Sequence, residues 1–386
     1  MRFWLFFWTV SAYAQVTTGA ISGYVLDPRE NPIARAEITL SQHERGLLRT
    51  VWTDDAGFYL LAELPPATYT ISAKASPFVP ASADLRLAVN TRMHADFRLG
   101  LASLTHSVNV IATVQLIPSD SSELGVVFDQ SQIQNLPLNR RDFLQLALLA
   151  PGVTPAVQNS ELSQRGGFAM HASGGREEFN SYLIDGVDNN DHYENTFALQ
   201  PSVDSIQEFK LVTSAYSAEY GRNAGGQVNL ITRGGGNALH GSLYEYLRNR
   251  SLDARNFFDA AGAQKLIRNQ FGVTAGGPVA RNRTFFFANF DGLRERQGLT
   301  RLAVVPSPAE RAGDLSGSGK TILDPFTRQP FPGARIPASR ISPLAAQVLK
   351  LFPAPGGSSG NYLAQPVLAE SFSQFHGRLD HRLPQA

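Results

Sequence analysis

Two neighbouring segments in which apolar and polar residues alternate constrain the fold more than any other feature. Residues 269–277 place Phe271, Val273 and Ala275 on one face of an extended strand. Residues 284–291 repeat the pattern, and transmembrane β-strands need about ten residues of such alternation. The two segments therefore predict a hairpin of a membrane barrel. The second segment has Phe286, Ala288 and Phe290 on its apolar face, and the polar faces carry Gln270, Gly272, Thr274 and Gly276 and then Asn289 and Asp291.

A strand-based membrane domain is also favoured because no segment beyond the N-terminus has about 18 uninterrupted apolar residues, the length of a spanning helix. Residues 276–278 and 281–283 bracket a short turn of the periplasmic kind, and a further strand is predicted near Phe372. Residues 294–370 are rich in Pro and Gly, which predicts a long loop, and a helix is expected within it at 344–351. Four candidate strands fall far short of the roughly 22 that close a plugged transporter, so we expect an incomplete barrel that forms no pore.

The N-terminus predicts export. Arg2 precedes an apolar run, residues 3–10, and Ala12 and Ala14 stand where a signal peptidase reads. The mature chain is expected to begin at Gln15. The absence of cysteine suits an oxidising compartment and excludes disulfides and thiolate metal sites.

Residues 19–99 show short alternating runs, such as Ile21, Gly23 and Val25, separated by turns rich in Pro, Gly and Asp. This pattern predicts a small β-sandwich. The order of the pieces resembles the carboxypeptidase regulatory-like domain, a transthyretin-like or carbohydrate-binding-like fold. None of the eight histidines is followed three residues later by glutamate, so the pairing that zinc carboxypeptidases need is missing.

Other chemical motifs also fail. The formal net charge of +1, with 17% charged residues, disfavours nucleic-acid binding. A calcium loop starting at Asp188 would have His192 and Tyr193 at its fifth and sixth positions, where an oxygen ligand and glycine are required. A phosphate loop ending at Lys320 would have Asp314 in place of its first glycine. We therefore predict no enzyme activity, no catalytic residues, no cofactor and no metal site.

The stretch from 180 to 247 connects these parts and resembles the end of the plug and the first barrel strand of TonB-dependent outer-membrane receptors, particularly the Oar-like group. A loop at 180–191 precedes a strand at 206–212, a glycine-bearing strand at 218–232 and a barrel strand at 240–249. Upstream, residues 129–153 predict a short helix between turns. The residues that carry the plug motif are Asp185, Gly186, Asp188, Glu208, Phe209, Glu219, Tyr220, Gly221, Gly225 and Gly226.

The resemblance implies a mainly β chain in four parts: a signal peptide (1–14), the sandwich (15–100), an α+β plug (101–238) and an incomplete transmembrane β-barrel (239–386). It also implies uptake of an unidentified extracellular ligand across the outer membrane of a Gram-negative-type bacterium, with membrane lipid around the barrel. A TonB-type energy transducer in the periplasm would pair with a short strand, for which the candidates are Val108, Asn109, Val110, Ile111 and Ala112. The alternative is an exported, non-transporting protein that binds carbohydrate or peptide through the sandwich and plug.

Overall fold

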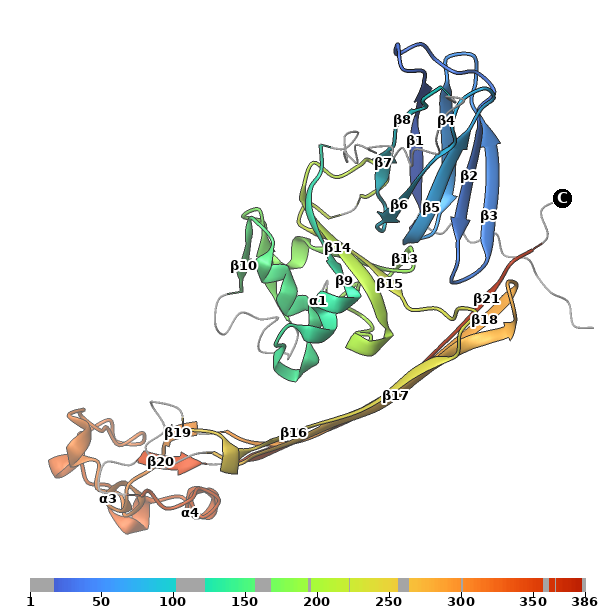
Figure 1. Ribbon diagram of the computed structural model, residues 1–386. Helices are drawn as coiled ribbons and strands as arrows, with labels where there is room; N and C mark the ends of the chain where they lie inside the picture. The colour runs from blue at the N-terminus through green and yellow to red at the C-terminus, as the bar shows by residue number, and fades with distance from the viewer. Residues whose placement is uncertain are drawn as a thin grey trace, which may run out of the picture. The chain divides into compact units, whose positions relative to one another are not determined.

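The computed structural model describes residues 17–101, 122–156, 168–193, 196–221, 223–255, 264–299, 301–356, 361–364 and 366–383. The chain divides into two compact units (Figure 1). The first comprises Met1–Leu243, Gly272–Asp291 and Gln374–Ala386, and the second comprises Tyr244–Phe271 and Gly292–Ser373. No helix within the described residues has the length and apolar character needed to cross a membrane.

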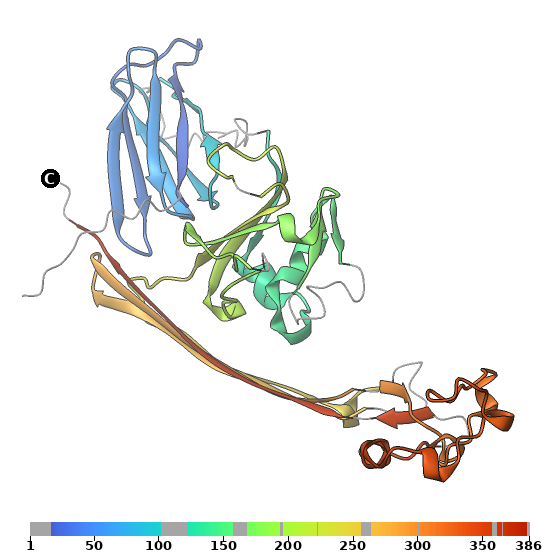
Figure 2. The same ribbon diagram turned by 180° about the vertical axis from the view of Figure 1, so that it is seen from behind.

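The predicted sandwich is present as two four-stranded sheets, drawn in blue in Figure 1 and seen from behind in Figure 2. One sheet has the order β4-β1-β7, with β8 also pairing with β1, and the other has the order β3-β2-β5-β6. The predicted alternation is confirmed, since Ile21, Val25, Ile38 and Leu40 are fully buried. The strands are β1 (Gly19–Leu26), β2 (Glu37–Gln42), β3 (Leu47–Trp52), β4 (Phe58–Leu64), β5 (Ala67–Lys74), β6 (Ala81–Leu87), β7 (Arg92–His94) and β8 (Phe97–Arg98).

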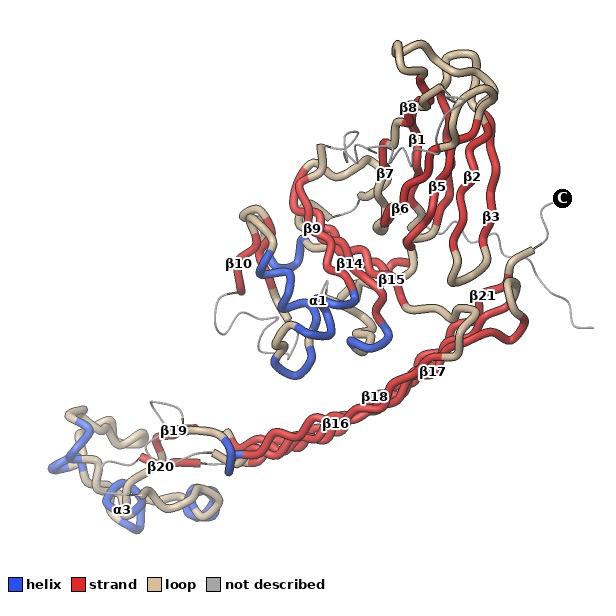
Figure 3. Tube along the Cα trace, in the orientation of Figure 1, coloured by secondary structure: helices blue, strands red, loops and turns tan. Residues whose placement is uncertain are grey.

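The predicted plug is built on a five-stranded sheet of order β13-β12-β15-β14-β9, with a separate β10-β11 pair. Strands β12 and β15 run parallel, and β14 is antiparallel to both β15 and β9. The helices of the plug lie around this sheet (Figure 3). The strands are β9 (Leu124–Asp129), β10 (Val153–Pro155), β11 (Met170–Ala172), β12 (Ser181–Ile184), β13 (Val187–Asp188), β14 (Ile206–Ser214) and β15 (Gln227–Thr232).

The helical part of the plug, predicted as one short helix, is divided into several turns. Asp129 accepts a hydrogen bond from the Gln132 nitrogen at 2.9 Å, and the Gln132 side chain accepts one from the Asp129 nitrogen at 3.0 Å, which caps α1. Phe143 then packs edge-on against Phe209 of the sheet, with ring centroids 5.3 Å apart. The helices are α1 (Gln130–Asn135) and the 3₁₀ turns η1 (Asn139–Arg141), η2 (Phe143–Leu149), η3 (Glu177–Phe179) and η4 (Val203–Ser205).

One predicted strand is shorter than expected. The segment 218–232 was expected to be extended throughout, but β15 begins only at Gln227. The preceding residues turn, and Gly225 donates a hydrogen bond to the Phe179 carbonyl at 2.7 Å. A β-carbon on Gly225 would lie 2.6 Å from that oxygen. The glycine therefore serves a close backbone contact within a loop rather than a bend within a strand.

The barrel segment is a four-stranded sheet of order β16-β17-β18-β21. Its predicted faces are confirmed: Thr274 and Asn289 are buried, whereas Val273 and Phe290 are exposed. The first strand of the hairpin was expected to end at residue 277 but continues to Ala280, so that only 281–283 separate the two strands. The strands are β16 (His240–Asn249), β17 (Leu266–Ala280), β18 (Thr284–Gly298) and β21 (Val367–His381).

The second unit contains the predicted long loop, which has structure of its own. Its β19 and β20 pair antiparallel, and the predicted helix at 344–351 is present as α4. A buried ion pair joins Arg268 Nε to Glu295 Oε2 at 2.5 Å. The elements are β19 (Arg301–Val304), β20 (Asn361–Ala364), α3 (Pro308–Arg311), α4 (Pro343–Leu349) and the 3₁₀ turns η5 (Arg250–Leu252), η6 (Ser316–Ser318), η7 (Pro332–Ala334) and η8 (Ala338–Arg340).

Candidate functional site

The most elaborate polar arrangement of the first unit lies where the sandwich meets the plug. Glu208 and Lys210 on β14 are 2% and 9% exposed, although charged side chains are rarely buried without partners. They alternate with Phe209, which is fully buried in the plug core. Successive side chains of a strand point to opposite faces, so the two charges share the sheet face away from that core.

Glu208 reaches a turn of the sandwich. Its carboxylate accepts a hydrogen bond from the backbone nitrogen of Val89, and Arg86 lies 3.5 Å away. Burial raises the pKa of Glu208, while the Val89 bond and the Arg86 charge act against that rise. Arg86 also pairs with Asp129 of the plug at 2.9 Å. The sandwich therefore supplies both a neutral and a charged donor to plug carboxylates.

Lys210 and Tyr220 hold the same sandwich turn. The Lys210 ammonium donates to the Asn90 carbonyl at 2.9 Å and to the Glu123 carboxylate at 2.7 Å. Asn90 has a φ of 46°, a left-handed conformation that asparagine tolerates, and its side-chain amide donates to the Tyr220 hydroxyl. Burial raises the pKa of Tyr220 to about 12, so the hydroxyl stays neutral as an acceptor.

A second polar group holds the end of the plug sheet against a barrel strand. Asp185 accepts hydrogen bonds from the backbone nitrogen and the hydroxyl of Thr232, at 2.9 and 2.5 Å. Arg378 of β21 donates to the Thr232 carbonyl at 2.7 Å and lies 3.4 Å from Asp185. The same guanidinium pairs with Asp380 at 2.9 Å. The last plug strand is therefore fixed from both sides immediately before the chain enters β16.

The sandwich also contacts the link between plug and barrel. The Asn237 nitrogen donates to the Glu44 carbonyl at 2.7 Å, in the turn between β2 and β3. Arg382, beyond β21, donates to the Gly46 carbonyl at 3.1 Å in that turn. Asn237 bonds Asn282 of the β17–β18 turn at 2.6 Å. One sandwich turn thus bonds both the link and the residue beyond β21, and the link in turn bonds the short barrel turn.

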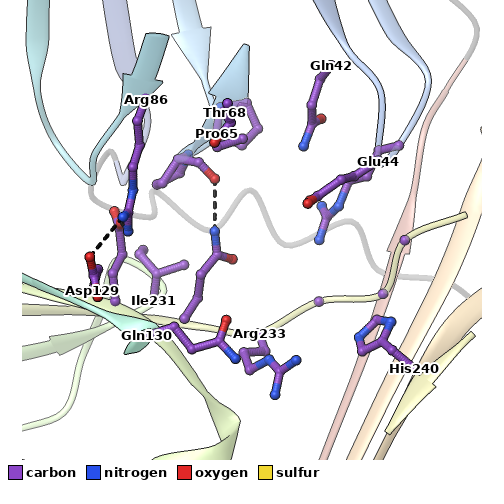
Figure 4. Close-up of a pocket in the computed structure, with 18 of the residues that line it drawn as sticks. Gln42, Glu44, Pro65, Thr68, Arg86, Asp129, Gln130, Ile231, Arg233 and His240 are labelled. Carbon is purple, nitrogen blue, oxygen red and sulfur yellow. Dashed lines mark hydrogen bonds and ion pairs between the residues drawn. The ribbon is translucent and has the colours of Figure 1, made fainter. Parts of the chain in front are cut away.

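A cleft of about 1030 Å³ lies among these parts (Figure 4). Most of its described lining residues are polar, with apolar ones such as Pro65, Pro66 and Ile231 among them, and the lining contains no Phe, Tyr or Trp. Arg233 donates to the Asp204 carbonyl at 3.3 Å, and burial lowers the pKa of its guanidinium. Such a cleft offers hydrogen-bond donors and acceptors but no nucleophile paired with a base. The polar lining includes Gln42, Glu44, Arg45, Arg86, Asp129, Gln130, Gln134, Asn135, Gln207, Glu208, Arg233, Asn237, His240 and Arg378.

The predicted plug-motif residues fall into separate places. Glu208 and Tyr220 lie at the joint with the sandwich, beside Glu219, which is 3.9 Å from Arg92. Asp185 with its left-handed neighbour Gly186 caps the sheet end, and Phe209 lies in the core. Asp188 accepts from the Asn190 nitrogen at 3.0 Å, a local turn. Gly225 and Gly226 lie close to the chain near Asn180, whereas a β-carbon on Gly221 would meet open space.

Two further predictions concern a metal site and the transducer strand. Across the part of the chain that the structure describes, no cluster of three metal-ligating side chains occurs. The candidate transducer strand at Val108 to Ala112 lies outside the described residues. Sequence reasoning missed Lys210, Asn90 and Arg378 as site residues. The charge of Lys210 between the apolar residues Phe209 and Leu211 was an available signal.

Three family models match the chain in succession. The carboxypeptidase regulatory-like domain matches residues 20–100, the TonB-dependent receptor plug domain matches 120–228, and an outer membrane β-barrel domain matches 231–386. The TonB-dependent transporter Oar of Myxococcus xanthus is 29% identical over 297 residues, which are 72% of this chain and 27% of that relative. The chain thus spans about a quarter of the relative's length. The predicted kinds of domain, and a place in the outer membrane, are confirmed.

Solved structures show a weaker likeness. The outer membrane transporter YddB from Escherichia coli has a TM-score of 0.38 and 15% identity, covering 65% of this chain and 30% of its own. The siderophore receptor PirA from Acinetobacter baumannii has a TM-score of 0.36 and 19% identity, covering 46% of this chain and 28% of its own. Likenesses this low carry no weight for fold or function.

Proposed function

We propose that this chain is an Oar-like TonB-dependent receptor of the outer membrane, and that it supplies the sandwich, plug and first barrel strands of a transporter for an unidentified extracellular ligand. The observation that carries the proposal is the direct passage from plug strand β15 to barrel strand β16. Thr232 ends the former and His240 begins the latter. Asp185 and Arg378 hold that passage in place.

The proposed mechanism is gating and involves no bond chemistry in the protein. The plug fills the barrel lumen until ligand outside and a TonB-type transducer inside together displace it. We propose boundaries of 1–14 for the signal peptide, 15–100 for the sandwich, 101–238 for the plug and 239–386 for the barrel segment. The partners are the transducer, outer-membrane lipid and the external ligand. Nucleic acid is not a partner, and no catalytic role is assigned.

The transducer would bind by strand addition. Residues 107–110 alternate polar and apolar side chains, and Ile111 and Ala112 continue the segment with apolar ones. An extended segment of this kind can pair with an exposed sheet edge through backbone hydrogen bonds. Backbone pairing requires little side-chain specificity, which suits a transducer that serves several receptors. The segment also stands between the residues that match the sandwich model, 20–100, and those that match the plug model, 120–228, so tension on it would act on the start of the plug sheet.

Disulfide trapping in cells tests this proposal. The chain contains no cysteine, so Val110→Cys creates a single thiol. Paired with single cysteines along the edge strand of the transducer's periplasmic domain, it should form a cross-linked product on non-reducing gels. Ser103→Cys is the matched control and should form little. Equal products from both positions, or none from any residue of 108–112, would remove these residues from the proposal.

A second candidate function rests on the polar cleft. In a non-transporting binding protein, carboxamide and guanidinium groups such as Gln130 and Arg233 would recognise a carbohydrate or a peptide. Saturable binding of a glycan or peptide library member by protein recovered from the soluble periplasm would favour this function. Recovery in the outer membrane together with cross-linking at Val110→Cys would favour the transporter.

A further inference from the structure

We propose that Lys210 is a positioning residue that holds the sandwich on the plug and makes this hold depend on the start of the plug chain. The inference rests on the proposed function for one point alone, namely that a transducer pulls on the chain that leads into the plug. The joint itself is a property of this protein's own residues. It makes the sandwich a docked part of the plug and not a free spacer.

The first observation is the pair of partners that one ammonium group holds. Lys210 Nζ lies 2.9 Å from the carbonyl of Asn90 in the sandwich and 2.7 Å from the carboxylate of Glu123. Glu123 is the second described residue after the segment 102–121, which leads from sandwich to plug. A lysine ammonium has three donors, so one group can serve both partners. The sandwich, the plug sheet and the incoming chain therefore meet at one atom.

The second observation is how firmly the same sandwich turn is held by neighbouring plug residues. Glu208, two positions before Lys210 on the same face of β14, accepts from the Val89 nitrogen. The Tyr220 hydroxyl accepts from the Asn90 side chain. Three plug side chains thus contact two consecutive sandwich residues. Such a concentration of bonds on one turn defines a docking point with a specific register.

The third observation is burial, which makes the partners interdependent. Lys210 is only 9% exposed, so little water can reach its ammonium group to replace a lost hydrogen-bond partner. Removing one partner of a buried ion pair leaves an uncompensated charge, which is strongly unfavourable. Drawing Glu123 away would therefore require water to enter the joint, and water would compete for the Asn90 carbonyl. Movement at the start of the plug should loosen the sandwich in the same step.

Distance measurement between spin labels tests the joint in the full chain. Because the chain has no cysteine, Asp55→Cys in an exposed sandwich turn and Leu149→Cys on the plug provide two label sites. Pulsed electron spin resonance should give one narrow distance distribution in the otherwise unchanged protein. Lys210→Met, which keeps the stem but removes the donors, should broaden it or add a longer distance. The matched control is Lys74→Met on the exposed face of the sandwich, which should change nothing.

The outcomes separate the joint from the proposed function. A folded Lys210→Met protein with the unchanged narrow distribution would overturn the inference. If Lys210→Met does not fold, Glu123→Gln tests the inference instead, since it removes the carboxylate charge from the bond to Lys210 and leaves Lys210 in place. That variant should broaden the distribution, and an unchanged distribution would again overturn the inference. No transducer is present in these measurements, so failure to bind a transducer would leave their result intact and would count against the proposed function alone.

Discussion

The carboxylate of Asp185 accepts two hydrogen bonds from Thr232, one from its backbone nitrogen at 2.9 Å and one from its hydroxyl at 2.5 Å. Asp185 follows β12 and Thr232 ends β15, and these strands are parallel neighbours. The pair therefore fastens together the ends of two adjacent strands at the exit of the plug.

Replacing Asp185 by alanine should loosen this strand end. The change leaves a buried backbone nitrogen and a hydroxyl without their acceptor, which costs about 1–3 kcal/mol. Amide hydrogen exchange in β15 should accelerate by roughly 5- to 100-fold if local opening governs it. Asp55→Ala, in an exposed turn of the sandwich, is the control. Equal exchange in both variants would show that Asp185 does not fasten the strand end.

The close approach at Gly225 gives a prediction with a matched control. A β-carbon there would lie 2.6 Å from the Phe179 carbonyl oxygen, which is backbone and cannot rotate away. Gly225→Ala should therefore destabilise the plug by about 1–3 kcal/mol. Gly221→Ala should be nearly neutral, because nothing lies within 4 Å of its added carbon. The measurement is the denaturant midpoint of the plug transition, and similar midpoints for the two variants would contradict the geometry.

Plug stability should depend on pH through Asp142. Burial raises the pKa of this carboxyl from 3.8 to about 6, against hydrogen bonds from Leu144 and Gln200. A raised folded-state pKa means that folding favours the protonated acid. Protonated Asp142 therefore makes its full contribution to the free energy of unfolding below pH 3.8, and this contribution is lost as the pH rises to about 6. The loss is on the order of 2 kcal/mol for this half-buried group.

The check is a pair of unfolding titrations between pH 3.5 and roughly 7. Asp142→Asn has no charge to desolvate and should flatten the decline over that window, relative to the unchanged protein. Asp55→Asn, on an exposed turn, should leave the decline as it is. An Asp142→Asn profile that falls as steeply as that of the unchanged protein would show that another group controls the pH dependence.

The strand framework could be predicted from sequence because alternation records which face of each strand is buried. Val273 and Thr274 are adjacent in the chain, yet the first is exposed and the second is buried. The start of β15 could not be predicted, because it depends on the close approach of Gly225 to Phe179, which are 46 positions apart. The only trace of this contact in the sequence is the glycine itself.

The joint was invisible to sequence reasoning for the same physical reason. Lys210 and Asn90 are 120 positions apart, and neither forms a motif with its neighbours. Glu208 was identified through the plug resemblance, but its partner is a backbone nitrogen, which every residue except proline possesses. Backbone donors and acceptors are common to nearly all residue types, so the sequence does not indicate which of them form a site. Sites built from them become apparent only once the fold brings the segments together.

The central claim, that this chain works with a TonB-type transducer, is tested most directly by binding between the purified full chain and the transducer's periplasmic domain. Val110→Pro removes one backbone donor within 108–112 and should weaken binding at least about tenfold if strand addition is the mode. Ser103→Pro, outside that segment, should bind as the unchanged chain does. Binding that is absent from the unchanged chain, or unaffected by Val110→Pro, would contradict the account.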